Sequence, residues 1–201
     1  MHGLIVVSHP LPESLTFGVA RQIGAGLVQA GHSFDIADLS AEGFDPRFGA
    51  SDVAVHLKQA PLDPAVAAEQ ARIGRADALV LVYPVYWWSF PALLKGWIDR
   101  VFTNGWAYEE MPDGEVVRKL GHLPIHLVAI GGADLRTYAR HGYFGAMRTQ
   151  IEHGIFGYCG APVRGSELLV PGEARDAAEM LQAGERIGRA IFAPLASAQA
   201  A

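Results

Sequence analysis

Three hydrogen-bonding side chains follow a pair of glycines in the second half of the chain. Gly131 and Gly132 come first, and Tyr138, His141 and Tyr143 follow shortly after them. Glycine has no Cβ, so its backbone can approach a bound molecule closely and aim N–H groups at developing negative charge. A phenol or an imidazole nearby can transfer a proton. The group is therefore a candidate catalytic site, and the simpler alternative is a plain turn followed by unrelated polar residues.

A second candidate site lies near the N-terminus, in the turn-rich segment 8–16. Ser14 and Thr16 offer hydroxyl groups just before an apolar pattern with helical spacing. The N-terminus of a helix offers free N–H groups and a positive dipole end, a combination that binds phosphate. His9 could contact the same phosphate. The segment has neither a Walker loop nor a Gly-x-Gly-x-x-Gly fingerprint, and the alternatives are an ordinary helix cap at Ser14 and a loop histidine at His9.

A third candidate is a run of aromatic residues after a buried apolar segment. Pro84 and Val85 are followed by Tyr86, Trp87 and Trp88. Three aromatic side chains in a loop between a strand and a helix need a partner, and backbone groups of this loop could pair with the edge of a flat heterocycle. The sequence thus predicts a planar ligand here, and the alternative is aromatic core or a dimer contact.

The segments around these residues alternate between strand and helix patterns, which predicts an α/β fold with a parallel sheet. Five strands suit the doubly wound order 2-1-3-4-5, in which strands 1, 3 and 4 are neighbours and their C-terminal loops, which carry the three candidates, meet. We expect one domain over 1–195 and a frayed tail over 196–201. The expected strands are 4–7, 33–39, 79–83, 122–130 and 163–170. The expected helices are 17–30, 63 or 64 to 75, 91–102, 143–157 and 173–191, and loops are expected over 40–62, with a short helix near 51–58, and over 104–121.

Composition excludes several classes of function. The chain has 201 residues, half of them hydrophobic, a net charge of −5 and no run of Lys or Arg, so nucleic acid is a poor partner. Cys159 is the single cysteine, which excludes an internal disulfide. No apolar stretch reaches ~18 residues and no leader precedes the first strand, so we expect a cytoplasmic protein without a transmembrane segment. We expect no metal.

The segment Tyr83-Pro-Val-Tyr-Trp-Trp-Ser-Phe-Pro-Ala-Leu-Leu-Lys-Gly-Trp-Ile-Asp-Arg-Val-Phe102 closely resembles the signature of the flavodoxin-like NAD(P)H:quinone reductases. The resemblance extends to the early His9 loop, to Gly105-Trp-Ala-Tyr108, to the Gly131 region and to Phe156-Gly-Tyr-Cys-Gly160. It spans most of the chain in the same order. The resemblance implies a flavodoxin-like three-layer sandwich that binds a flavin as a homodimer.

The resemblance also implies how the flavin would be held. Ser14, Leu15 and Thr16 would hold its phosphates, the segment Pro84 to Trp88 its isoalloxazine ring, and Gly131 and Gly132 its pyrimidine end. In FAD-binding members an acidic residue in the Lys-Gly-Trp helix lies near the adenosine, and Asp99 takes that position. This favours FAD, with FMN as the alternative.

Further implied roles concern the substrate and the proton. Tyr108 resembles the aromatic residue that reaches across the dimer to cover the partner's site, where Trp88 and Phe144 would also contact substrate. Tyr138 matches the family's active-site tyrosine. The animal enzymes carry a histidine six residues further on, and this chain has Phe144 there. The proton-relay role therefore goes to Tyr138, with His141 or Tyr143 as alternatives.

The implied activity is two-electron reduction of a quinone by NADH or NADPH, with both substrates using one slot in turn, a ping-pong scheme. Three alternatives stay open on the sequence. One is an FMN-dependent azo- or nitroreductase. Another is a regulatory flavoprotein subunit of a membrane transporter. The last is an electron carrier of the flavodoxin type, which the aromatic-lined loop disfavours.

Overall fold

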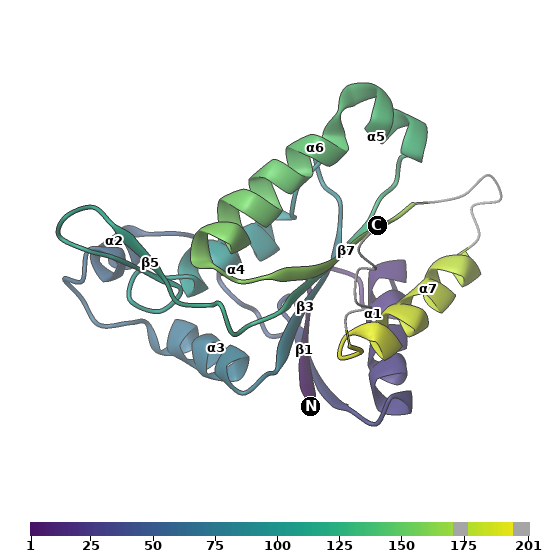
Figure 1. Ribbon diagram of the computed structural model, residues 1–201, viewed down its shortest axis with the longest axis horizontal. Coiled ribbons are helices and arrows are strands. Elements are labelled where there is room, and N and C mark those ends of the chain that lie inside the picture. Colours follow the sequence, from purple (N-terminus) through teal and green to yellow (C-terminus); the bar gives the residue numbers. More distant parts are fainter. Residues whose placement is uncertain (171–176, 195–201) are drawn as a thin grey trace, which may run out of the picture.

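The fold is built on a five-stranded parallel sheet. The computed structural model describes residues 1–170 and 177–194, so the expected frayed tail 196–201 lies outside the described residues. The strands lie in the order β2-β1-β3-β6-β7, and every neighbouring pair is parallel (Figure 1). This is the predicted order 2-1-3-4-5. The strands are β1 (His2–Val7), β2 (Ser33–Asp38), β3 (Ala78–Pro84), β6 (Ile125–Ile130) and β7 (Val163–Leu169).

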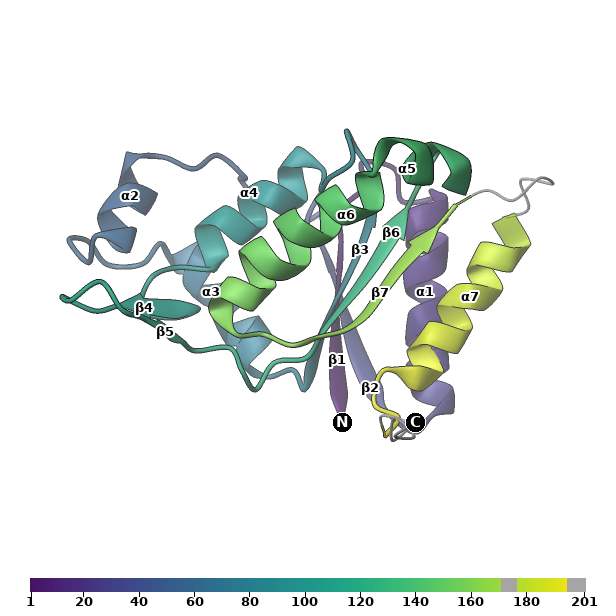
Figure 2. The ribbon, with the colours of Figure 1, turned by 45° about the horizontal axis from the view of Figure 1, so that its top comes forward.

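Helices cover both faces of the sheet and give three layers (Figure 2). The two apolar clusters on the two faces share no residue. Strands β1, β3 and β6 are almost wholly buried, as expected for strands covered on both sides. One face carries α1 (Leu15–Gln29) and α7 (Ala177–Ala190), and the other carries α3 (Pro64–Gly74), α4 (Ala92–Val101), α6 (Tyr143–Met147) and η1 (Arg148–Gly157).

Helices α1 and α7 pack through glycines, so that their backbones touch. A Cβ on Gly26 would collide with the backbone oxygen of Glu185, and a Cβ on Gly188 would collide with the backbone oxygen of Ile23. At contacts this close no other residue fits without moving a helix. The C-terminal helix is therefore fixed directly against the first helix of the chain.

Two local predictions were wrong, and a third was right in its bounds but not in its helix type. The segment after Gly132, expected as a loop, contains α5 (Leu135–His141), which begins at the N-cap Asp134 and ends at Gly142 with φ +70°. The expected loop 104–121 contains a hairpin of β4 (Tyr108–Glu110) and β5 (Val116–Arg118). The helix expected over 143–157 is present, and it is α-helical in α6 and π-helical in η1.

The long segment between β2 and α3 is held by a buried arginine on α4. The short helix near its centre is present as α2 (Ala50–His56). Arg100 Nε lies 2.9 Å from an Asp52 carboxylate oxygen, and its Nη2 lies 3.1 Å from Asp63. Its Nη1 donates to the backbone oxygen of Asp45 at 2.8 Å. One guanidinium thus ties three parts of this segment to the sheet's covering layer.

Candidate active site

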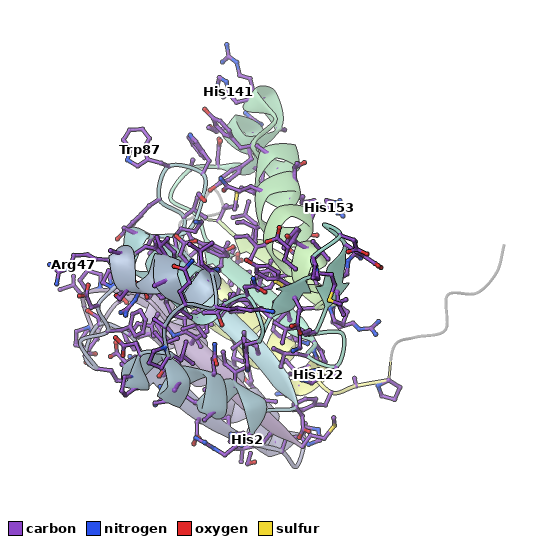
Figure 3. The ribbon with its side chains drawn as sticks, turned by 90° about the vertical axis from the view of Figure 1, so that its left-hand side faces the viewer. His2, Arg47, Trp87, His122, His141 and His153 are labelled. Atoms are coloured by element: carbon purple, nitrogen blue, oxygen red, sulfur yellow. The ribbon has the colours of Figure 1, made fainter. Side chains whose placement is uncertain are left out.

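The three candidate loops meet at the C-terminal edge of the sheet, because β1, β3 and β6 are neighbours in it. Figure 3 shows Trp87 and His141 at one end of the molecule and His2, at the start of β1, at the other. In an open parallel sheet this edge is where ligands bind.

The N-terminus of α1 forms the first wall. Ser14 is the N-cap, and its hydroxyl oxygen accepts from the Phe17 N–H at 3.4 Å. The N–H groups of Leu15 and Thr16 lie in the first turn, where a helix provides no acceptor. His9 Nδ1 accepts from the Leu11 N–H at 3.0 Å, so in the neutral ring the proton sits on Nε2. The loop therefore offers N–H donors that suit a phosphate.

The aromatic loop is a tight turn with an unusual backbone. Tyr86 and Ser89 exchange backbone hydrogen bonds of 3.2 and 3.1 Å. Between them, Trp87 has φ +48° and Trp88 has φ +60°. A non-glycine residue in this region costs about 1–3 kcal/mol, and such strain is concentrated at functional sites. Within the described residues the N–H groups of Trp87 and Trp88 have no partner, so both can bind the edge of a ligand.

The two tryptophans differ in their surroundings. The Trp87 side chain is 93% exposed. The Trp88 ring stacks on Tyr143 with centroids 3.7 Å apart and meets Tyr138 edge-on at 5.3 Å. A slot of about 160 Å³ opens between this loop and the start of the third loop, lined by Val85, Trp87, Trp88, Gly132, Ala133 and Tyr138.

The two glycines have different roles, which corrects the expectation that both supply free donors. Gly131 donates its N–H to the backbone oxygen of Leu169 at 2.8 Å, because it still belongs to the sheet's hydrogen-bond ladder. A Cβ at this position would lie 2.7 Å from Tyr138 Oη, so Gly131 makes room for that hydroxyl. Gly132 is exposed, a Cβ there would meet nothing within 4 Å, and its N–H has no partner among the described residues.

Of the three candidate proton donors, only Tyr138 lines the slot. Tyr138 is 1% exposed, and burial raises its pKa. Tyr143 lies behind Trp88, and the exposed His141 ring stacks on Tyr143 at 5.3 Å. Phe144 packs against Tyr138 at 5.4 Å but lines a separate cavity beneath α6.

Tyr108 and Asp99 lie apart from the slot. The Tyr108 hydroxyl is 3.3 Å from His56 Nδ1, and its ring meets the Tyr158 ring edge-on at 5.1 Å. His56 and Tyr158 were not singled out from the sequence, although Tyr158 lies in one of the matching segments. Asp99 pairs with Lys95 at 2.6 Å on the partly exposed side of α4. No contact among the described residues brings Tyr108 to the slot of its own chain.

The donor set fits a flavin. The slot combines unpartnered backbone N–H groups at one edge with stacked aromatic rings, and the first turn of α1 adds phosphate donors nearby. In the part of the chain that the structure describes, no helix is both long and apolar enough to cross a membrane.

Known proteins match almost the whole chain. Residues 1–190 match a family model described as a flavodoxin-like fold. The ribosyldihydronicotinamide dehydrogenase [quinone] of Pongo abelii is 28% identical over 184 residues, covering 82% of this chain and 79% of that protein. The NAD(P)H dehydrogenase [quinone] 1 of Cavia porcellus is 29% identical over 188 residues, covering 83% and 67%.

Solved structures agree with these matches. An NAD(P)H:quinone oxidoreductase from Methanothermobacter marburgensis superposes with a TM-score of 0.83 at 28% identity, covering 94% of this chain and 98% of that one. The general stress protein 14 of Treponema denticola, in complex with FMN, superposes with a TM-score of 0.62 at 26% identity, covering 96% and 97%. The sheet order, the site at its edge and the match over residues 1–190 together show that this chain belongs to the flavodoxin-like fold family.

Proposed function

We propose that this chain is a flavin-dependent NAD(P)H:quinone oxidoreductase. The observation that carries the proposal is the slot at the edge of the sheet, where Trp87, Trp88 and Gly132, whose N–H groups have no partner among the described residues, line one opening with Tyr138. The relatives named as quinone dehydrogenases and the quinone oxidoreductase structure support it.

Each part of the proposed site has one task. The first turn of α1, with Ser14, Leu15, Thr16 and the Nε2–H of His9, would hold the phosphates. The loop from Pro84 to Trp88 would hold the ring by its backbone, while the Gly132 N–H would face negative charge at the far end. One well-placed donor of this kind is worth about 3 kcal/mol. The Tyr138 hydroxyl would add a second donor and supply a proton.

The chemistry supplied by a bound flavin is two-electron hydride transfer from NAD(P)H to a quinone through its N5. The protein would let nicotinamide and quinone bind in turn at one place, against the face of the ring held between the aromatic loop and the glycine loop. Sharing one slot gives ping-pong kinetics, so initial-rate lines at several quinone concentrations should be parallel. Intersecting lines would exclude the shared slot.

The cofactor is proposed to be FAD, with FMN as the alternative. Asp99 lies on α4, about 10 Å along the axis from the aromatic loop at 1.5 Å per residue, a distance that an adenosine can span. The Asp99 carboxylate is already paired with Lys95. This ion pair is exposed and contributes little to stability, so ribose hydroxyls could compete for the carboxylate. The FMN in the Treponema denticola structure supports the alternative. Heat release followed by chromatography of the flavin distinguishes the two.

A homodimer completes the proposal. Tyr108 is not among the residues that line the slot of its own chain and is held at the β4–β5 hairpin beside Tyr158. We propose that it covers the slot of a second copy. Measurement of the molecular mass in solution tests the homodimer. In Y108A we expect a raised KM for quinone at unchanged flavin content, which tests the role of Tyr108.

The function is tested first by colour and turnover. The purified protein, reconstituted with FAD or FMN, should absorb visible light and oxidise NADH or NADPH only when a benzoquinone is present. A protein that binds neither flavin refutes the proposal. Turnover with azo dyes but not with quinones would favour the azoreductase alternative. The azoreductase AzrA is similar to this chain in fold.

A charge substitution tests the phosphate site itself. S14D keeps a good N-cap but adds a negative charge where the phosphate would lie, whereas S14N keeps the cap without the charge. We expect flavin affinity to fall at least tenfold, about 1.4 kcal/mol, in S14D relative to S14N, with equal thermal stability of the two apoproteins. Equal flavin affinities of S14D and S14N would show that the phosphates do not bind at the N-terminus of α1.

A further inference from the structure

A second and larger cavity lies between the sheet and the helical segment that follows α5. Its volume is about 380 Å³, room for on the order of ten water molecules at ~30 Å³ each. Tyr83 from β3, Ser166 from β7, and Arg148 and Glu152 from η1 contribute its polar atoms. Most of the remaining lining is apolar. The cavity is open to solvent on one side, and the proposed function does not yet use it.

Two tyrosines lie between the cavity and the slot, and Tyr138 acts electrostatically on Tyr83. Tyr83 faces Ala129 across the β3–β6 pair, and Gly131 lies two residues further along the same face of the sheet. Tyr138 Oη is pressed against Gly131, where a Cβ would be 2.7 Å away. Because Ala129 and Gly131 are small, neither places a bulky side chain between Tyr83 and the Tyr138 hydroxyl. Tyr83 lines the cavity and Tyr138 lines the slot.

The solvent end of the cavity carries a carboxylate. The Glu152 side chain is 15% exposed and one of its oxygens lies 3.4 Å from Arg148 Nε. It sits in the π-helix η1, and π-helical turns are frequent at functional sites. Glu167 on β7 also lines the cavity, and among the described residues no histidine does. The Tyr83 hydroxyl has no hydrogen-bond partner among the described residues, and the side chain is only 1% exposed.

Tyr138 must regain a proton in each turnover. Reduction of a quinone consumes one proton: NAD(P)H, a proton and the quinone give NAD(P)⁺ and the hydroquinone. If Tyr138 gives that proton to the quinone oxygen, it must regain one; its side chain is only 1% exposed, and a quinone in the slot would cover the side on which Tyr138 lines it. His141 is exposed but contacts Tyr143, not Tyr138.

We propose that this cavity is a water-filled proton path, in which Glu152 takes a proton from solvent and Tyr83 passes it to Tyr138. The proposal rests on the proposed function. In one turnover the Tyr138 O–H bond breaks as the quinone oxygen gains its proton. A proton from Tyr83 then restores Tyr138, water restores Tyr83, and Glu152 restores the water. Glu152 regains its proton from solvent, so one proton is taken up per turnover.

The environment of the two phenols suits this role. Burial raises the pKa of Tyr83, and the charge of Glu152 raises it further. Burial raises the pKa of Tyr138 as well. Both phenols therefore stay neutral at physiological pH, so they can relay protons as hydroxyl groups. Arg148, Glu152, Glu167 and Tyr138 are the charged or titratable groups that act on or around Tyr83.

Two electron acceptors separate proton delivery from electron transfer. A benzoquinone takes up a proton on reduction, whereas ferricyanide takes electrons singly and binds no proton. In Y83F and E152Q we expect single-turnover reduction of the quinone to slow at least tenfold, with a larger solvent isotope effect, while ferricyanide reduction is unchanged. The control E167Q, a carboxylate on the same cavity, should leave both rates unchanged.

The outcomes distinguish the two proposals. If the wild type oxidises NAD(P)H with neither acceptor, the proposed function fails. If the wild type is active and Y83F and E152Q reduce quinone at the wild-type rate, the proton path is wrong. An equal loss with both acceptors would also overturn it, because the damage would then be structural.

A measurement on the apoprotein is independent of activity. A high-resolution crystal structure should show ordered water hydrogen-bonded to Tyr83 Oη and linked to the Glu152 carboxylate. A dry cavity would overturn the proposal. Y83F removes a hydroxyl that has no protein partner among the described residues, so its thermal stability should match that of the wild type.

Discussion

The two adjacent glycines at the end of β6 allow a matched test of the site's packing. In G131A the new methyl group would lie 2.7 Å from Tyr138 Oη and 2.9 Å from Val170 Cγ1. Both distances are too short, so either the tyrosine or the end of β7 must move. In G132A the methyl group would point into open space. The two variants therefore add the same atom one residue apart with opposite expected results.

The expected penalty follows from overpacking. Inserting a methyl group into a tightly packed site costs about 1–3 kcal/mol, which for a chain of this length lowers Tm by roughly 2–12 °C. G132A should be neutral or stabilise by up to about 1 kcal/mol, because alanine restricts the unfolded chain. Urea denaturation of the apoproteins measures the free energy of unfolding without any contribution from bound flavin.

A double-mutant cycle identifies the atom responsible. Y138F removes the hydroxyl oxygen that the methyl group added by G131A would meet first, so G131A should cost at least about 0.5 kcal/mol less in that background. The reasoning is refuted if G131A and G132A have equal stability, or if the cost of G131A is the same with and without the Tyr138 hydroxyl.

Three further outcomes test other parts of the structure. R100M should lower the free energy of unfolding by about 3 kcal/mol in urea denaturation, because it leaves the buried Asp52 carboxylate without its partner; a loss below about 1 kcal/mol would show that the pair is unimportant. Burial lowers the pKa of His126 to about 4, so only the unfolded chain binds this proton between pH 6.5 and 4, and stability should fall by roughly 3 kcal/mol over that range; H126Q should flatten this part of the pH–stability curve. Burial raises the pKa of the Cys159 thiol to about 11, so a disulfide reagent at pH 8 should modify Cys159 slowly in the native protein and rapidly in urea, and equal rates would contradict its burial.

The sheet and its order could be predicted because the information is local. Strands such as 79–83 are continuous apolar runs, and the Pro84 break and the helical spacing after Pro91 mark where each element ends. Helix α5 was missed although Asp134 is an N-cap and Gly142 ends the helix, because the polar residues between them hid a single short apolar face. The three-residue strands of the hairpin are too short to show alternation.

The site was predictable in its loops but not in its details. The residue types at Ser14, Trp88 and Tyr138 pointed to the three loops that meet at the site. The Gly131 N–H donates to Leu169 within the sheet because of the register between β6 and β7, and no local sequence pattern encodes that register. The Arg100 pairs and the cavity beneath α6 depend on elements that are distant in sequence, so spacing alone could not reveal them.

The direct backbone contact between α1 and α7 has a steric consequence. Because Gly26 and Gly188 leave no side chain between the helices, a larger residue at either position would force the two backbones apart. The packing of α7 therefore depends on two positions that no side chain can fill, on the same helix α1 that Ser14 caps.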